Sequence, residues 1–232
     1  MSLRQLLDLV LPAECAGCRR AGSPWCRRCC RALDRLAFPG GPRLVTPDPA
    51  PPGAVPVHAW GAYGDPLRAV VTAWKDEGRR DLVGVLAPLL TAALATVPTP
   101  GRDRDDPVLV VPAPSSRRSR RVRGDVPLHE LTARALQALA PGPEVFAPVL
   151  GECRDVLDQS RLGSAARRAN VSGAFTVRRA WRPLVTGRDC VVVDDLMTTG
   201  ATIADCARAL RGAGAAGVRG VTIAAPRRRA GR

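Results

Sequence analysis

The sequence predicts an α/β protein with a mostly parallel sheet, preceded by a small cysteine-rich module. Two observations predict this fold. From residue 57 onward, short apolar runs rich in β-branched residues alternate with segments of helical spacing. Before that point, four cysteines form two Cys-x-x-Cys pairs within residues 15–29. We therefore divide the 232-residue chain into a module at 1–38, a Pro- and Gly-rich linker at 39–56 and a main domain at 57–232.

The elements of the main domain follow from its periodicity. Strands are predicted at 57–63, 108–111, 145–150, 174–177, 190–193 and 218–224. Helices are predicted at 66–74, 82–97, 129–139 and 202–210, the last with Ile203, Cys206, Ala207 and Leu210 on one face. Strands that alternate with helices favour parallel pairing, because the helices cover both faces of the sheet.

The composition restricts the kinds of partner. The formal net charge is +14, and Lys75 is the only lysine in an arginine-rich chain. Such a charge favours polyanions, either phosphorylated metabolites or nucleic acid. No stretch reaches the roughly 18 to 20 apolar residues of a membrane span. Asp8 interrupts the apolar start and only Arg4 precedes it, so we expect no secretory signal, no membrane insertion and a cytoplasmic location.

The cysteine pairs predict a metal site. Cys15 and Cys18 form one knuckle, and Cys26 and Cys29 form a second one seven residues later. Four thiolates satisfy the tetrahedral preference of zinc and leave no open position for a substrate, so we expect a structural Zn²⁺. Cys30 could exchange with Cys29 in the ligand set. The alternative is a group of redox or incidental thiols.

The most informative stretch covers residues 191–203 and reads Val-Val-Val-Asp-Asp-Leu-Met-Thr-Thr-Gly-Ala-Thr-Ile. An apolar run ends in Asp194 and Asp195, and a loop with Gly200 then leads into a helix. Such a loop binds phosphate through backbone N–H groups and the helix dipole, while the carboxylates suit sugar hydroxyls or a sugar-bound cation. The stretch therefore predicts a phosphoribosyl site. The alternative is a tight turn in which Asp and Thr act only as caps.

This stretch resembles the phosphoribosyl-pyrophosphate (PRPP) signature of type I phosphoribosyltransferases. The resemblance implies a parallel sheet of that kind and ribose hydroxyls held by Asp194 and Asp195, sometimes through Mg²⁺. It also implies a 5′-phosphate loop made of Thr198, Thr199, Gly200, Ala201 and Thr202. Purine-salvage members usually have an aspartate where this chain has Thr198, which argues against a salvage reaction.

The rest of the chain resembles the ComF-type phosphoribosyltransferase-like proteins, which are associated with natural competence for DNA uptake in some bacteria. The four-cysteine module, Trp74-Lys75-x-x-Gly78 and Val111-Pro112-Ala113-Pro114 carry this resemblance. So do the positions of Arg120, Arg123, Gly124, Gln159, Leu162, Arg168, Asn170, Gly173 and Phe175.

This second resemblance adds site residues to the PRPP motif. Arg123 is expected to stabilise the departing pyrophosphate, since guanidinium groups hold phosphate oxygens in a bidentate manner. Lys75, Gln159 and Arg168 are further candidates for PRPP contacts. The alternative for the arginine-rich loop at 117–123 is a solvated basic loop or a nucleic-acid patch.

Two functions remain open on the sequence alone. The first is a Mg²⁺-dependent transfer of the phosphoribosyl group from PRPP to an acceptor that the sequence does not identify. The second is a non-catalytic protein that senses PRPP or nucleotides, or that handles single-stranded DNA together with a competence helicase. The few aromatic residues disfavour DNA binding by base stacking but leave an electrostatic groove open.

Overall fold

Six strands form the main sheet of the computed structural model, which describes residues 13–98, 107–115, 126–153 and 173–226. Their order across the sheet is β1-β2-β8-β7-β3-β4. The strands are β1 (Arg43–Val45), β2 (Val57–Ala62), β3 (Val108–Pro112), β4 (Glu144–Phe146), β7 (Asp189–Leu196) and β8 (Gly217–Ala225). Only β1 runs antiparallel to its neighbour β2; the other pairs are parallel. The predicted α/β fold with a mostly parallel sheet is confirmed.

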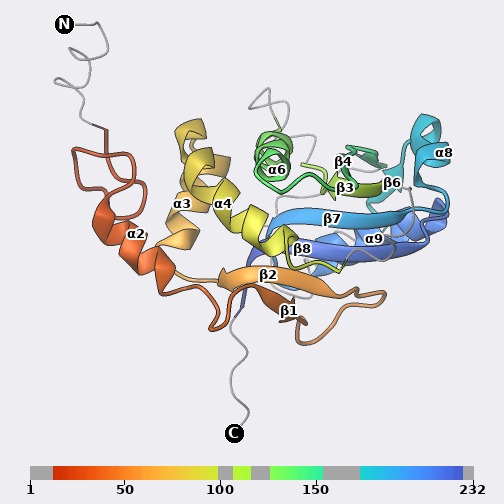
Figure 1. Cartoon of the computed structure of the whole chain (residues 1–232), viewed down its shortest axis with the longest axis horizontal. Coiled ribbons are helices and arrows are strands. Elements are labelled where there is room, and N and C mark those ends of the chain that lie inside the picture. Colours follow the sequence, from red (N-terminus) through yellow and green to blue (C-terminus); the bar gives the residue numbers. More distant parts are fainter. Residues whose placement is uncertain (1–12, 99–106, 116–125, 154–172, 227–232) are drawn as a thin grey trace, which may run out of the picture.

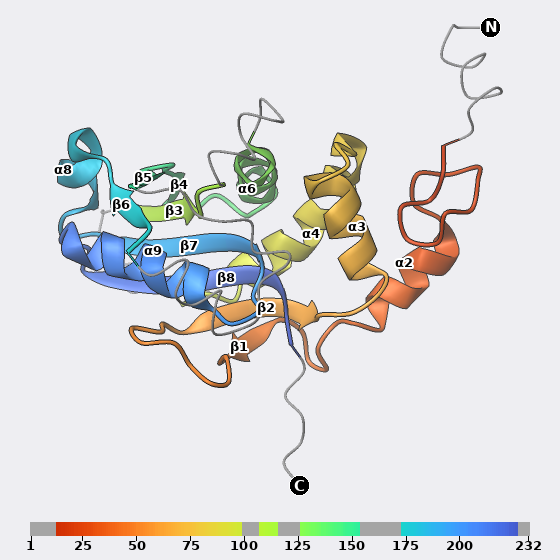
Figure 2. The ribbon, with the colours of Figure 1, turned by 180° about the vertical axis from the view of Figure 1, so that it is seen from behind.

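Helices cover both faces of this sheet, as Figures 1 and 2 show from opposite sides. On one face, α4 (Val83–Leu94) contacts β2 and β8 and packs against α6 (Pro127–Gln137), which contacts β3 and β7. On the other face, α9 (Ala201–Gly212) contacts β7 and β8. The central strands are therefore buried from both sides, which explains why β3 reads as an unbroken apolar run instead of an alternating one.

The shorter elements lie toward the ends of the molecule. Helix α3 (Leu67–Lys75) buries Leu67, Val70, Val71 and Trp74 and is followed by the 3₁₀ turn η1 (Arg80–Leu82). Strands β5 (Leu150–Glu152) and β6 (Phe175–Val177) form a separate antiparallel pair. The 3₁₀ turn η3 (Arg179–Trp181) and the short helix α8 (Arg182–Val185) follow β6. None of the helices in the described part of the chain has the length and apolar character that a membrane span requires.

The predicted strand at 145–150 is wrong in one respect. The structure has two strands there, β4 ending at Phe146 and β5 beginning at Leu150. Pro148 lies between them and has no N–H to donate to a ladder, so the strand stops and the chain changes sheets.

The N-terminal module attaches to the carboxyl end of β2. Its helix α2 (Arg27–Asp34) buries Cys29 and Leu33, and the residues after it pair with the strand. Ala62 N donates to Leu36 O, and Ala37 forms a bridge with Gly61. A Cβ on Gly61 would lie 2.5 Å from Leu36 O, so this close approach requires glycine. Strand β1 lies within the segment that we interpreted as a linker.

Candidate functional site

Asp194 and Asp195 lie near the end of β7, at the carboxyl edge of the sheet. Asp195 is buried, and Asp194 is partly buried. Successive side chains of a strand point to opposite faces, so the two carboxylates face different surroundings. Asp195 N donates to Asp194 Oδ1 at 2.9 Å, and Leu196 N donates to Asp195 Oδ1 at 2.9 Å. Thr222 Oγ1 on the neighbouring β8 donates to Asp195 O at 2.9 Å. Main-chain N–H groups of β7 therefore hold both carboxylates, and the Thr222 side chain of β8 holds the main chain at Asp195.

The second acid has a cationic partner. Lys75, the last residue of α3, places its Nζ 2.6 Å from Asp195 Oδ2. Burial would raise the pKa of Asp195, but the Lys75 ammonium outweighs it and lowers that pKa below its usual value. Conversely, partial burial would lower the pKa of Lys75, but the carboxylates of Asp195 and Asp194 raise it. At neutral pH the two groups form an ion pair.

The first acid behaves in the opposite way. Burial, and then the negative charge of Asp195, raise the pKa of Asp194 to about 8. Lys75 weakens this effect without cancelling it. Two adjacent carboxylates thus differ in protonation near pH 7, with Asp195 ionised and Asp194 carrying a proton in much of the population.

The predicted phosphate loop follows directly. Residues 197–200 connect β7 to α9, and Gly200 has a φ of 72°, in the left-handed region that favours glycine. A Cβ on Gly200 would lie 2.9 Å from Pro47 Cγ, so the position is also closed to larger residues. Thr199 Oγ1 accepts a hydrogen bond from Ala201 N at 3.4 Å. The first N–H groups of α9 have no carbonyl within the helix to bond to, and they face the same edge as the two acids.

The carboxyl end of β3 adjoins this edge. Pro112 pairs with Val193, and Ala113 N donates to Val193 O at 2.8 Å. The Pro112-Ala113-Pro114 segment therefore begins beside the first of the two acids. The edge brings together Asp194, Asp195, Lys75 and the loop formed by Thr198, Thr199, Gly200, Ala201 and Thr202.

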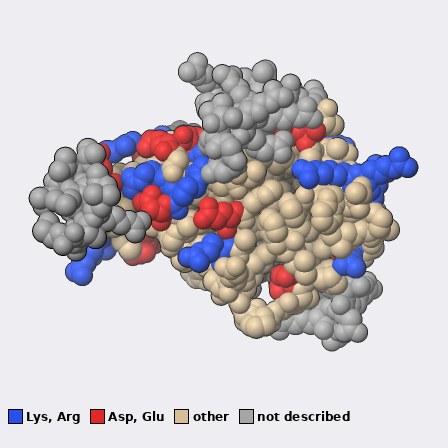
Figure 3. Space-filling view, turned by 90° about the horizontal axis from the view of Figure 1, so that it is seen from above, with Lys and Arg blue, Asp and Glu red and all other residues tan. Residues whose placement is uncertain are grey.

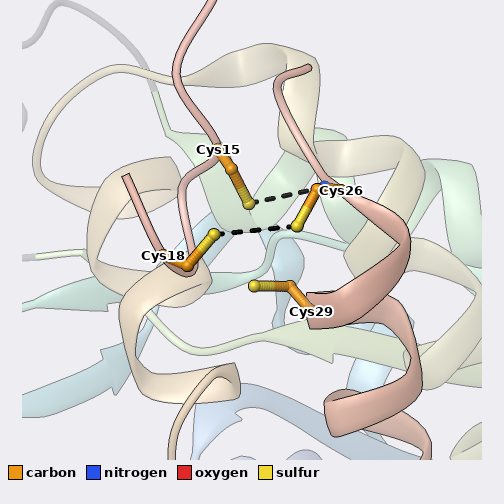
Figure 4. A group of neighbouring side chains, drawn as sticks. All are labelled: Cys15, Cys18, Cys26 and Cys29. Carbon is orange, nitrogen blue, oxygen red and sulfur yellow. Dashed lines mark hydrogen bonds between the residues drawn. The ribbon is translucent and has the colours of Figure 1, made fainter. Parts of the chain in front are cut away.

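The four predicted cysteines form a second cluster, separate from this edge. The Sγ atoms of Cys15, Cys18, Cys26 and Cys29 all lie within 4.8 Å of one another and point toward a common centre (Figure 4). Cys18 Sγ and Cys26 Sγ are 3.7 Å apart, close to the roughly 3.8 Å between sulfurs that a tetrahedron with Zn–S bonds of about 2.3 Å implies. Cys30 is exposed and lies outside the cluster, so the structure selects Cys29 over Cys30.

The surroundings of the cluster also fit a metal. Burial would raise the pKa of Cys15, but N–H groups, first that of Cys26, bring it down to about 6, so this thiol ionises readily. Burial and the neighbouring thiols raise the pKa of Cys29, since several thiolates without a cation repel one another. A Cβ on Gly17 would lie 2.7 Å from Cys29 Sγ, so glycine lets the knuckle close around the sulfurs. The four cysteines are positioned for a metal site, and their number and spacing suit zinc.

Comparison with known families adds to this geometry. Residues 156–232 match the family model of the phosphoribosyl transferase domain. The C-terminal part of this chain is therefore similar to a phosphoribosyl transferase domain. The match contains β6, β7, α9 and β8, and so includes the two acids and the loop. No curated protein matches the chain.

Several predicted site residues lie outside the described residues. These are Arg123, Gln159 and Arg168, together with the rest of the arginine-rich loop at 117–123. Their roles stay predictions. The described part of the chain ends at Ser115 before the gap that contains Arg123, and begins again at Gly173 after the gap that contains Gln159 and Arg168.

One buried acid in the region that matches the phosphoribosyl transferase model was missed by the sequence reasoning. Asp205 on α9 accepts hydrogen bonds from Gly173 N at 2.7 Å and Phe175 N at 2.9 Å. Arg208 Nε donates to the same carboxylate at 2.6 Å, and Arg208 Nη2 donates to Phe175 O at 2.7 Å. This Asp205–Arg208 clamp fastens β6 to the helix that follows the phosphate loop. The signal in the sequence was an Asp and an Arg three residues apart on a helix whose other buried residues are all apolar.

Proposed function

We propose that the protein binds PRPP at the carboxyl edge of β7 and β3 and transfers its 5-phosphoribosyl group to an acceptor. The observation that carries this proposal is the pair Asp194–Asp195 at the end of a buried strand, followed at once by the Gly200 turn that opens α9. The family match over residues 156–232 supports a PRPP-using function of this class.

The 5′-phosphate would bind at the N-terminus of α9. Free N–H groups of the first helical turn point toward an anion there, and the helix dipole favours negative charge. Gly200 allows the backbone to approach closely, and the hydroxyls of Thr198, Thr199 and Thr202 can donate to phosphate oxygens. The phosphate would anchor the sugar directly beside the acids.

The ribose hydroxyls would then face Asp194. Asp195 is held by Lys75 and the main chain, so it serves as a fixed negative charge close to the sugar. Negative charge there stabilises a sugar ring that becomes cationic as the bond to pyrophosphate stretches. Lys75 prevents the two adjacent carboxylates from repelling each other fully, and its ammonium also lies at the edge where phosphates would bind.

The transfer itself replaces one bond at the anomeric carbon of ribose. The C–O bond to pyrophosphate breaks, the acceptor's nucleophilic atom bonds to the same carbon, and the acceptor's proton passes to solvent or a base. The leaving pyrophosphate would lie against the segment after β3, where Arg123 is the predicted contact. Thr198 offers no carboxylate to take the acceptor's proton, which disfavours purine salvage.

Mg²⁺ is the cofactor that this class of ligand implies. The fit is uneven, because Lys75 already occupies Oδ2 of Asp195, while Asp194 is partly exposed and its Oδ1 accepts an N–H bond from Asp195. Asp194 is thus the residue that would hold a PRPP-bound Mg²⁺, and such an ion would neutralise charge on the departing pyrophosphate.

The direct test measures pyrophosphate release from PRPP and Mg²⁺ across a panel of bases and amines, with PRPP affinity determined in parallel by calorimetry. We expect PRPP binding that Asp194→Asn with Asp195→Asn abolishes. Leu44→Ala, an exposed change on the edge strand β1, is the matched control. Unchanged PRPP affinity in the double variant would refute the site. Affinity without release from any acceptor would favour the sensing function instead.

A second candidate function is contact with single-stranded DNA through α2, which would fit an association with DNA uptake. Arg28, Arg31 and Arg35 are exposed at spacings of three and four residues, on the side of the helix away from Cys29 and Leu33. A stripe of this kind contacts phosphates without reading bases. Oligonucleotide affinity should fall with salt, and removing all three arginines should lower the slope of log K against log salt by about two to three. A slope that does not change would exclude this surface.

A further inference from the structure

The segment after α3 lies between the cysteine module and the acidic pair. It follows Lys75, the last residue of α3, whose Nζ contacts Asp195, and it contains Glu77 and Arg79, which both contact the module. On the face drawn in Figure 3, basic and acidic residues gather side by side toward the end of the molecule that carries α2 and α3 in Figure 1. The two module contacts thus lie two and four positions after the residue that contacts the acidic pair.

The first module contact comes from the first cysteine knuckle. Arg19 Nη2 lies 3.1 Å from Glu77 Oε1. Arg19 has a φ of 60°, which a residue with a side chain adopts only at a cost of about 1 kcal/mol or more. Two bonds close the knuckle and hold this conformation: Arg19 N donates to Cys15 O at 2.8 Å, and Cys15 N donates to Arg20 O at 2.9 Å. A metal on the knuckle would therefore hold Arg19 where it reaches Glu77.

The second contact with the module comes from Arg79. The guanidinium of Arg79 is oriented by a bidentate bond to Asp81, at 2.9 and 2.7 Å. Its remaining Nη1 donates to Glu14 O at 3.2 Å, one residue before the first cysteine of the cluster. The main-chain N of Arg79 donates to Ala73 O, which ties this arginine to the last turn of α3. The two arginines thus connect both ends of the Cys15–Cys18 knuckle to the turn that carries Lys75.

We propose that Arg19 and Arg79 are positioning residues through which metal binding in the four-cysteine module holds Lys75 against Asp195. A small module of this kind depends on its metal for folding, so metal loss removes Arg19 and Glu14 from the places where they make these contacts. Coupling between two sites is reciprocal, so a ligand that binds the ordered acidic edge tightens metal binding by the same factor. The inference rests on the proposed function for the meaning of that edge, whereas its test needs no PRPP.

The test uses the fact that Lys75 is the only lysine of the chain. Its side chain is 42% exposed, so acetic anhydride can reach the amine, while the ion pair with Asp195 keeps it protonated and slow to react. Peptide mass spectrometry separates Lys75 from the N-terminal amine. We expect zinc-loaded protein to acetylate at Lys75 about three- to tenfold more slowly than chelated protein, the range that two partly exposed contacts can supply. Equal rates would overturn the proposal.

Variants then separate positioning from simple loss of the module. Arg19→Gly removes the side chain while glycine adopts the same φ freely, so zinc affinity should be retained. With zinc bound, both Arg19→Gly and Glu77→Gln should raise the Lys75 rate about twofold or more, and Arg19→Lys should restore it in part. Arg20→Gly in the same knuckle is the control and should match the parent protein, because the exposed Arg20 contributes only its main-chain carbonyl to the knuckle and its side chain forms no hydrogen bond or ion pair with Glu77 or Arg79. Parent-like rates in both test variants would show that the Arg19–Glu77 contact does not position Lys75, and would overturn the role proposed for Arg19.

A third measurement distinguishes this inference from the proposed function. PRPP affinity is compared with and without zinc, in the parent protein and in Glu77→Gln. A zinc-dependent Lys75 rate together with no PRPP binding at all would leave the positioning intact and refute the ligand. PRPP binding together with a Lys75 acetylation rate that does not change with zinc would support the ligand and refute the positioning.

Discussion

Lys75 Nζ lies 2.6 Å from Asp195 Oδ2, although 120 residues separate the two in the chain. The bond joins the end of α3 to the end of β7, so it both fastens a helix to the sheet and sets the charge of the acidic pair. The Asp195 carboxylate is buried and the Lys75 side chain is about half exposed, so the pair resembles a buried ion pair whose lysine still contacts solvent.

Replacing the lysine should leave Asp195 as a buried charge without its partner. Lys75→Met is expected to cost about 2 kcal/mol of unfolding free energy at pH 7, below the figure for a fully buried pair because Lys75 is partly exposed. The pKa of Asp195 is lowered in the folded state, so this stability is present above pH 4 and is lost as the pH falls. Urea unfolding at pH 7 measures the effect. Adding Asp195→Asn should recover part of the loss, and strictly additive effects would contradict direct coupling.

The opposite sign applies to Asp194. Its pKa is raised to about 8, so the folded state holds a proton that the unfolded state releases near pH 4. This group therefore weakens the fold progressively as the pH rises from 4 to 8, and the full penalty remains above 8. Asp194→Asn should gain roughly 1 to 2 kcal/mol at pH 8.5 relative to its effect at pH 5, a discounted figure because the side chain is partly solvated. If the unfolding free energies of the parent and of Asp194→Asn change with pH in the same way, the raised pKa of Asp194 is contradicted.

The Asp205–Arg208 clamp should matter for stability without touching the ligand edge. Asp205→Asn keeps the shape but replaces one acceptor oxygen by a donor, which leaves Gly173 N or Phe175 N unpaired. We expect a loss of about 2 kcal/mol. Hydrogen exchange should accelerate at those two amides before it does so in β7. Arg208→Ala, which removes a half-exposed partner, is expected to cost about half as much. An Asp205→Asn protein with protected amides would show that the clamp is dispensable.

Gly200 is constrained by both its backbone angle and its neighbour. Gly200→Ala must keep a φ of 72° and place a Cβ 2.9 Å from Pro47 Cγ. The expected cost is about 1 to 3 kcal/mol of stability, with phosphate affinity reduced further because the loop shifts. Gly212→Ala is the matched control, since a Cβ there meets no atom within 4 Å. Calorimetry with inorganic phosphate and thermal unfolding compare the two variants; equal behaviour would mean that the loop tolerates a side chain.

The cysteine module should depend on its metal. Chelation is expected to unfold the first forty or so residues while the main sheet persists, because the module buries few apolar side chains of its own. Limited proteolysis followed by mass spectrometry locates the cuts. A metal-free protein in which residues 13–38 stay resistant would contradict a structural zinc site.

Local patterns predicted much of this fold. The run Val191–Val193, the turn at Gly200 and the apolar face of the helix beyond it are features of adjacent residues, and the structure has β7 and α9 there. The four cysteines were equally readable, since their spacing alone defines two knuckles. By contrast, the Lys75–Asp195 bond depends on how α3 packs beside β7, which no local pattern specifies. A lone lysine after a helix usually remains in solvent. Pro148 was visible, yet its effect on one continuous strand was overlooked.

The strand order has a consequence for how the protein is made. β8 is synthesised after every other described strand, yet it lies in the middle of the sheet, between β2 and β7. Until residues 217–225 leave the ribosome, β1 with β2 and β7 with β3 and β4 are two separate half-sheets, each with an exposed edge. The main-chain carbonyl of Asp195 therefore gains its bond from Thr222 only after the last strand has been made. A nascent chain of this protein would need protection against pairing with another chain at those edges.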